Sequence, residues 1–244
     1  MDKRHYVYLL RCADGSLYTG MTPDIARRLR QHVARLPGCA KYTRSHPVTA
    51  LALLLTTDTA TTARQLEARI KRLTRAQKDA LIADPACLPD LCPAVAAAKQ
   101  KAEETGAPAG AMVLPDGRVV TGKTSSLLGA SAALLLNALK AMAGIRSDMN
   151  LISNQVIEPI SALKIQSLGH HNPRLHSDEV LIALAISALT NPLADMARAQ
   201  LGTLRGCDAH FSVIISEEDI KLYKRLGIHV SCEPKYESKR LYHK

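Results

Sequence analysis

Residues 5–20, HYVYLLRCADGSLYTG, decide how the first part of this chain folds. Strand-forming residues flank Ala13-Asp14-Gly15, a turn signal, so the stretch predicts a β-hairpin. A two-residue loop would place Tyr8 and Tyr18 on opposite faces of that hairpin. A three-residue loop, with Gly15 in the left-handed bulge position, would pair Leu10 with Tyr18 and place both tyrosines on one face. Shared chemistry of the two tyrosines requires this second arrangement.

A helix from Pro23 to about Arg35 follows the hairpin, with Thr22 as its expected cap. Arg28 and His32 stand four residues apart in this helix and therefore share a face. Together these two residues present a cation and an imidazole beside the hairpin.

The next segments predict a strand at 48–55, a helix from about Thr61 that carries Glu67, and a third helix that starts with a capping box at Thr74. Two strands, a helix, a strand and two helices form a small α+β domain.

Charge is distributed unevenly along the chain. Residues 1–83 hold 15 Lys and Arg against 6 Asp and Glu, a net charge of +9, whereas residues 84–244 hold 17 against 16. A strongly basic small domain attracts polyanions and releases counterions when it neutralises phosphates. The asymmetry favours nucleic acid as a partner over an Arg-rich surface that serves only solubility.

The tyrosine motifs and their spacing to later residues resemble the GIY-YIG nuclease family, in particular its short, stand-alone bacterial members. The motifs are Tyr6-Val7-Tyr8 and Tyr18-Thr19-Gly20, followed by Arg28, His32 and Glu67. The resemblance covers about the first third of the chain. It implies a metal-dependent endonuclease that hydrolyses DNA phosphodiester bonds, with branched, flapped or damaged DNA as the substrate.

The resemblance also implies roles for these residues. Glu67 would hold one Mg²⁺ or Mn²⁺ ion, since a hard cation prefers carboxylate oxygen and keeps most of its waters. Arg28 would grip the phosphate. Tyr8 or Tyr18, with His32 nearby, would orient or deprotonate the attacking water, and the sequence does not say which tyrosine is the base. The candidates for holding flanking phosphates are Lys41, Arg44, Lys71 and Arg72.

One departure from the family concerns asparagine. Many members carry an asparagine late in the domain, but the first one in this chain is Asn137. Either this subgroup works without it, or turnover is impaired.

Residues 84–107 read as a Pro- and Ala-rich linker with a short helix near 95–104, which divides a domain at 1–83 from one at 108–244. The second domain is predicted as mostly helical α+β. Its expected elements are a hairpin at 112–121, helices near 126–143, 153–168, 177–190 and 192–205, a strand at 210–215, a helix capped by Ser216 and a strand at 228–232.

Residues from about 105 to 243 resemble the C-terminal region of a bacterial protein family of unknown function. The stretches that carry this likeness are 114–125, 172–179 and 232–236. Full-length relatives have a larger region in front, so this chain is either a genuine fusion or a product of gene rearrangement or prediction.

Two motifs in the second domain suggest ligands. Residues 117–124 satisfy the phosphate-loop pattern G-x-x-x-x-G-K-T, but turn and strand chemistry there favours a hairpin running into a helix, and we expect no bound cofactor. A cluster of His170, His171, His176, Asp178 and Glu179 reads as a polar loop capping a helix, with a metal site as the less favoured alternative.

Three functions therefore remain: a structure-specific nuclease, an inactive nuclease fold that binds nucleic acid, and a phosphate- or nucleotide-binding protein that works through the second domain. The charged start indicates no signal peptide, and apolar runs stay short of the roughly 20 residues that span a bilayer. We expect a cytoplasmic protein without a membrane partner. Its oligomeric state is left open.

Overall fold

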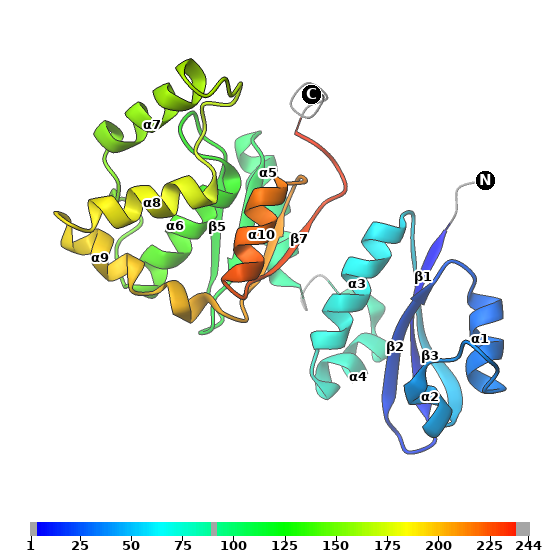
Figure 1. The fold of residues 1–244 in the computed structure, drawn as a ribbon. Coiled ribbons are helices and arrows are strands. Elements are labelled where there is room, and N and C mark those ends of the chain that lie inside the picture. Colours follow the sequence, from blue (N-terminus) through cyan, green and yellow to red (C-terminus); the bar gives the residue numbers. More distant parts are fainter. Residues whose placement is uncertain (1–3, 89–91, 238–244) are drawn as a thin grey trace. The chain divides into compact units, whose positions relative to one another are not determined.

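The computed structural model describes residues 4–88 and 92–237. The chain forms two compact units, Met1–Leu91 and Cys92–Lys244 (Figure 1). Both mix helices with a small sheet, so the α+β class expected for each is confirmed. Within the described ranges, no helix is both long enough and apolar enough to cross a membrane.

The first unit has three strands, four α-helices and a 3₁₀ turn among its described residues. They are β1 (His5–Cys12), β2 (Leu17–Thr22), α1 (Ile25–Val33), α2 (Lys41–Ser45), β3 (Val48–Thr57), α3 (Ala60–Arg72), α4 (Arg75–Ala83) and η1 (Pro85–Cys87).

The sheet of the first unit is antiparallel, in the order β2-β1-β3. Because alternate residues of a strand point to opposite faces, β1 serves two purposes. Val7 and Leu9 join an apolar core with Ala63 and Ile70 of α3. Tyr8 points to the opposite face of the sheet, where it is fully buried. The central strand therefore builds the core with one face and presents Tyr8 on the other.

The second unit contains four strands, six α-helices and a 3₁₀ turn among its described residues. They are α5 (Pro93–Thr105), β4 (Ala109–Val113), β5 (Val119–Lys123), α6 (Ala130–Met142), α7 (Asn154–Gln166), α8 (Ser177–Ser187), α9 (Pro192–Arg198), η2 (Leu201–Leu204), β6 (Asp208–Phe211), α10 (Glu217–Arg225) and β7 (His229–Cys232).

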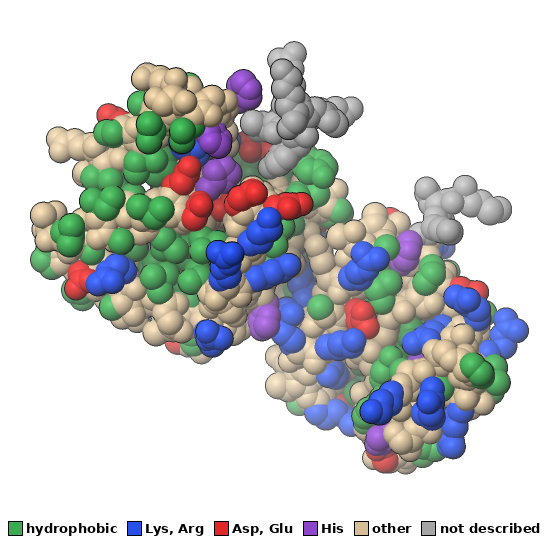
Figure 2. Space-filling view, viewed as in Figure 1, with side chains coloured by type: hydrophobic (Ala, Val, Ile, Leu, Met, Phe, Trp, Pro, Cys, Tyr) green, Lys and Arg blue, Asp and Glu red, His purple; other side chains and the backbone are tan. Residues whose placement is uncertain are grey.

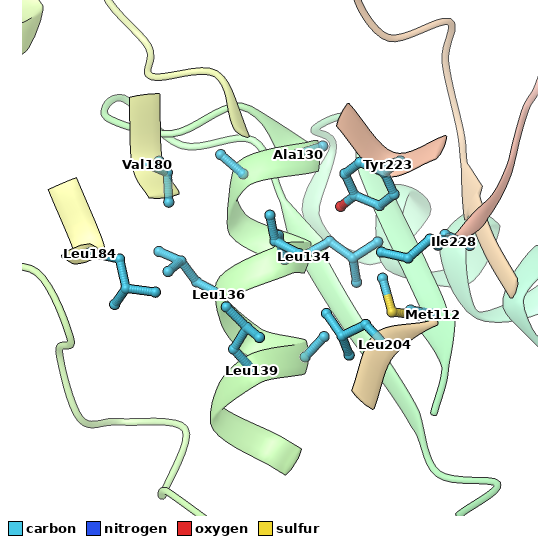
Figure 3. Packing of buried hydrophobic residues seen from close by; sticks show 14 of the residues in the cluster. Met112, Ala130, Leu134, Leu136, Leu139, Val180, Leu184, Leu204, Tyr223 and Ile228 are labelled. Carbon is cyan, nitrogen blue, oxygen red and sulfur yellow. The ribbon is translucent and has the colours of Figure 1, made fainter. Parts of the chain in front are cut away.

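The four strands of the second unit run in the order β5-β4-β6-β7, with only β6 and β7 parallel. Ala111 packs with Ala94 and Ala98 of α5, whereas the next residue, Met112, points into the main core. Figure 3 shows that core, in which Leu134 of α6 and Tyr223 of α10 lie near Met112. Helices therefore cover both faces of this sheet.

Several elements differ from the expectations. The helix expected near 95–104 is α5, which packs against β4 instead of standing alone in a linker; residues 89–91 of that linker lie outside the described residues. The strand expected at 210–215 is β6, which ends at Phe211 because its pairing with β4 ends there. Helix α9 is shorter than expected, and a 3₁₀ turn that contains Gly202 follows it. Helix α2, with five residues, is too short to give a periodic signal.

Gly122 sets the distance between β5 and α6, so we predict that Gly122→Ala destabilises the second unit. An added Cβ would lie 2.2 Å from the backbone nitrogen of Leu134, which cannot move without shifting the helix. We expect a loss of about 3 kcal/mol in the free energy of unfolding, the upper end of the usual cost of overpacking. Gly202→Ala is the control, because nothing lies within 4 Å of its Cβ position. Urea unfolding followed by circular dichroism measures both, and equal stabilities would contradict this packing.

Candidate active site

The hairpin brings the two tyrosines to one face. Leu10 pairs with Tyr18, and the amide of Cys12 donates to the carbonyl of Ser16 at 2.9 Å, as the three-residue loop requires. Gly15 has φ of +79°, the left-handed conformation expected of it. The ring centroids of Tyr8 and Tyr18 lie 6.4 Å apart. The predicted register is therefore confirmed.

Gly20 leaves room for the Tyr8 side chain. It pairs with Tyr8 across the hairpin, and a Cβ on Gly20 would lie 2.5 Å from the Tyr8 hydroxyl oxygen. A side chain there would displace the phenol from its place. The glycine of the second motif thus has a steric role in the position of the first motif's tyrosine.

Helix α1 supplies the partners of Tyr8. Asp24 caps this helix by accepting from the amide of Arg27 at 2.9 Å, so the expected cap at Thr22 is wrong. The Thr22 hydroxyl instead accepts from the Asp24 amide, and the helix begins at Ile25. One turn apart on this helix, Arg28 and His32 both reach the Tyr8 hydroxyl.

The hydrogen bonds around Tyr8 form a chain of defined direction. The Thr43 hydroxyl donates to the carbonyl of Ala40 at 3.1 Å, so its oxygen accepts from His32 Nδ1 at 2.7 Å. The proton of the neutral imidazole is then on Nδ1, and Nε2 accepts from the Tyr8 hydroxyl at 2.9 Å. The Tyr8 oxygen in turn accepts from Arg28 Nε at 3.2 Å. We call this chain, Arg28 to Tyr8 to His32 to Thr43, the tyrosine relay.

Burial and charge keep His32 neutral. Burial, followed by the charge of Arg28, lowers the pKa of His32 to about 4. Burial raises the pKa of the Tyr8 phenol, although the hydrogen bond and charge of Arg28 act in the opposite direction. Burial lowers the pKa of Arg28, but contacts with Tyr8 and Tyr18 outweigh it and raise the value. The relay therefore holds a neutral base, a protonated phenol and a permanent cation near pH 7.

Glu67 is the carboxylate that the resemblance to GIY-YIG nucleases implies as the metal ligand. It lies on α3, and its charge contributes to the raised pKa of Tyr8. Its Oε1 atom is 2.9 Å from Lys71 Nζ, and its side chain is 20% exposed. No group of three or more His, Cys, Asp or Glu side chains that could hold a metal ion occurs within residues 4–88 and 92–237. A single carboxylate suits a hard divalent ion that keeps most of its waters, and it does not suit a fully protein-coordinated metal.

Comparison with known proteins identifies both parts. Residues 4–80 match the GIY-YIG catalytic domain, and residues 90–242 match the domain of unknown function DUF1846, C-terminal. The chain belongs to the DUF1846 C-terminal family. It carries a GIY-YIG catalytic domain in front of that region.

The relatives of the DUF1846 region are longer proteins. A UPF0371 protein of Corynebacterium efficiens is 55% identical over 150 residues, which cover 62% of this chain and 30% of the relative. One from Streptococcus pyogenes is 44% identical over 181 residues, 74% of this chain and 36% of the relative. The chain thus spans about a third of the length of these relatives. The chain is also similar to a UPF0213 protein from Bacillus halodurans whose solution structure is known. The sequence identity is 38% and the TM-score is 0.23, and the match covers 33% of this chain and 83% of that one.

The basic residues expected to hold flanking phosphates are exposed on two helices of the GIY-YIG domain. Lys41 and Arg44 lie on α2, and Lys71 and Arg72 lie in the last turn of α3. Lys71 contacts Glu67 in addition. Figure 2 shows Lys and Arg side chains spread over the visible face of this domain, with few acidic ones among them.

Sequence reasoning missed three residues that complete the cluster. Thr43 ends the tyrosine relay, and Gln31 accepts from Arg28 Nη1 at 3.2 Å. Tyr42 stacks on Tyr18, with ring centroids 6.1 Å apart and planes 18° apart. Thr43 and Tyr42 lie on the short helix α2, which gives no periodic pattern. The K-Y-T-R composition, aromatic and hydroxyl residues between two cations, is the one local signal for them.

The two motifs of the DUF1846 region have structural roles. Gly117 sits in the β4–β5 turn with φ of +84°, and Lys123 is exposed at the end of edge strand β5, so the phosphate-loop pattern forms a hairpin. His176 caps α8, and its Nδ1 atom donates to Asp219 at 3.2 Å. Glu179 accepts from the His176 amide and from the buried Lys164. The capping interpretation of the histidine cluster therefore agrees with these contacts.

We predict that His32 stays neutral in the folded protein down to about pH 4. An unfolded histidine takes up a proton near pH 6.5. Because only the unfolded chain is protonated between these values, the stability that neutral His32 contributes is complete above pH 6.5 and is lost as the pH falls toward 4. Nitrogen chemical shifts of the imidazole measure both the pKa and the Nδ1–H tautomer. A His32 titration near 6.5, or an Nε2–H tautomer, would contradict the direction of the relay.

Proposed function

We propose that the GIY-YIG domain is a metal-dependent endonuclease that hydrolyses DNA phosphodiester bonds, with branched, flapped or damaged DNA as its substrate. The observation that carries this proposal is the tyrosine relay. It holds a neutral imidazole and a guanidinium within hydrogen-bonding distance of one phenol, that of Tyr8. Phosphodiester hydrolysis requires an oriented water and neutralisation of the charge on the phosphate oxygens, and these groups can supply both.

Arg28 is the phosphate-binding group in this proposal. Its Nη1 atom donates to the Gly38 carbonyl at 2.6 Å and to Gln31, while Nε donates to Tyr8. These acceptors fix the plane of the guanidinium fork before any substrate binds. A fixed fork loses little entropy on binding, so it can stabilise charge that develops on the phosphate oxygens.

We assign to Tyr8 the role of orienting the attacking water. Its hydroxyl proton points toward His32 Nε2, which leaves the oxygen to accept hydrogen bonds, one of which comes from Arg28. The pKa of His32, about 4, is too low for it to take the phenol proton outright. His32 instead holds that proton away from the water, so it acts as a positioning residue. Tyr8 is fully buried and bonded to Arg28, so its oxygen can meet a water only if the site opens when the substrate binds.

Glu67 would hold the divalent ion, Mg²⁺ or Mn²⁺. Such an ion, when bound, supplies charge that stabilises the leaving oxygen. The lone carboxylate and its 20% exposed side chain fit an ion that stays largely hydrated. Lys71 at 2.9 Å neutralises Glu67 in the absence of a metal, and its exposed, flexible side chain can turn toward a DNA phosphate once an ion takes its place.

We predict that Glu67→Gln abolishes cleavage but leaves DNA binding nearly intact. The amide keeps the size of the side chain and removes the charge that holds the ion, whereas phosphate contacts come from other residues. Asp58→Asn, which neutralises an exposed carboxylate in the same domain, is the matched control and should cleave normally. Magnesium-dependent nicking of plasmid and branched DNA, together with a binding titration, measures both effects. Undiminished cleavage by Glu67→Gln would assign the metal role elsewhere, and no cleavage by the wild-type chain would favour a binding module.

We also predict that DNA binding weakens steeply as salt increases. With a net charge of +9 on residues 1–83, several phosphates should be neutralised on binding, and each contributes about 0.9 to the slope of log affinity against log salt. The double variant Lys41→Gln/Arg44→Gln should lower that slope by about 2. Lys221→Gln/Arg225→Gln, with the same charge change on α10, should leave it unchanged. A flat salt dependence would rule out the electrostatic contribution.

A further inference from the structure

A small cavity lies in the DUF1846 region where the loop after β5 meets the N-terminal ends of α6, α8 and α10. It has a volume of about 60 Å³ and is lined, among others, by Thr124, Gly129, Ser131, Arg174 and His176. We call it the α6 cavity. It belongs wholly to the second unit, and the proposed nuclease function makes no use of it.

The N-terminal end of α6 is buried without acceptors. Gly129, the residue before the helix, has no side chain that could cap it. Ala130, Ser131 and Ala132 are 6%, 3% and 0% exposed, and their amides have no acceptor within residues 4–88 and 92–237. Buried amides without acceptors are costly and rare. Water or a ligand in the cavity can satisfy them, and the helix dipole favours a negatively charged ligand.

Two hydroxyls on the cavity wall, carried by largely buried residues, share this lack of partners. Ser131 is 3% exposed and Thr124 is 9% exposed, and both line the cavity. Neither side chain has a hydrogen-bond partner in the part of the chain that the structure describes. The hydroxyls are independent of the helix amides, yet they face the same space. Amides and hydroxyls together form a set of donors without an acceptor.

The neighbouring helix ends differ, since the protein caps them itself. Asp219 accepts from the Ser177 amide at the start of α8, and Ser216 caps α10 by accepting from the Asp219 amide. The Asp219 carboxylate also accepts from Ser216 and from His176, so its charge is compensated inside the protein. Among the residues that the structure describes, an acceptor for the first amides occurs in α8 and α10 but not in α6.

The charged side chains at the cavity are arranged in pairs. Arg174 Nη1 is 2.9 Å from Glu237 Oε1, so a carboxylate already lies at this edge of the cavity. Asp219 raises the pKa of His176 through a hydrogen bond. His176 makes that bond through Nδ1. An anion in the cavity would thus meet Arg174 and His176, each with its carboxylate partner, in addition to the donors of α6.

We propose that the α6 cavity binds a phosphate group, either of a free phosphate ion or of a phosphate monoester. One bound water occupies about 10–15 Å³ of cavity volume. The α6 cavity, at about 60 Å³, therefore accommodates a group of a few heavy atoms but is too small for a whole nucleotide. The remainder of a larger ligand would lie outside the cavity. The site is distinct from the GIY-YIG domain, which handles phosphodiesters in the proposal above.

Titration of the full-length chain tests this site, with inorganic phosphate as one probe and glycerol phosphate as the other. Calorimetry should detect saturable binding in the millimolar range or tighter. Tighter binding of the monoester would indicate a ligand that extends out of the cavity, and tighter binding of the ion would indicate free phosphate. Because Arg28 is a phosphate ligand in the proposed nuclease site, Arg28→Gln is titrated in parallel and should retain this binding. Absence of saturable binding, or its loss in Arg28→Gln, would overturn the proposal.

Four variants locate the binding. Ser131→Ala should weaken it about 10-fold, since it removes a hydrogen bond to a charged group. Ser187→Ala is the matched control, because Ser187 is a buried, unpartnered serine of α8 that does not line the cavity. Glu237→Gln should tighten binding by releasing Arg174. Ser131→Asp should abolish binding and raise the melting temperature, because its own carboxylate would satisfy the amides of α6. If both Ser131→Ala and Ser131→Asp bind phosphate as tightly as the wild-type chain does, the phosphate binds at another site and the proposal is overturned.

Discussion

The hydrogen bond between the Tyr8 hydroxyl and His32 Nε2 organises the GIY-YIG domain. It joins the central strand to α1, and the bond from His32 to Thr43 continues it to α2. Gly20 must lack a side chain for the phenol to reach this place. Each donor in the relay has one acceptor, which is how buried polar groups avoid the cost of desolvation. The same bonds that hold three elements together therefore set the direction of the protons in the relay.

The tyrosine relay and the α6 cavity differ in how their polar groups are satisfied. In the GIY-YIG domain, the relay is complete and ends on the carbonyl of Ala40. In the DUF1846 region, the buried Lys164 is paired with Glu179 and Asp219 is fully bonded, yet the start of α6 and the hydroxyl of Ser131 have no acceptor among the described residues. A satisfied network gives rigidity, whereas donors without a protein acceptor in a cavity leave room for water or a ligand. This contrast is why the second unit, and not the first, carries the inference of an additional binding site.

Fusion of a GIY-YIG domain to a DUF1846 C-terminal region gives a chain with two chemically different parts. The basic residues concentrate in the first part, and residues 84–244 are nearly neutral. Net charge of this kind directs association with polyanions, but it does not define a fold or a reaction. The relatives of the second part are about three times as long as the matched region.

The sequence by itself determined the hairpin register, the shared face of Arg28 and His32, the α+β class of both units and the charge asymmetry. These follow from local periodicity and turn chemistry, in which neighbouring residues along the chain decide the outcome. Tertiary structure alone decided that Thr43 ends the relay, that α5 packs on β4, and that β6 stops at Phe211. It alone decided also that α6 begins in a cavity without a cap. Such features depend on contacts between residues far apart in the sequence. Local sequence patterns do not predict which hydrogen-bond donors will find an acceptor in the folded chain.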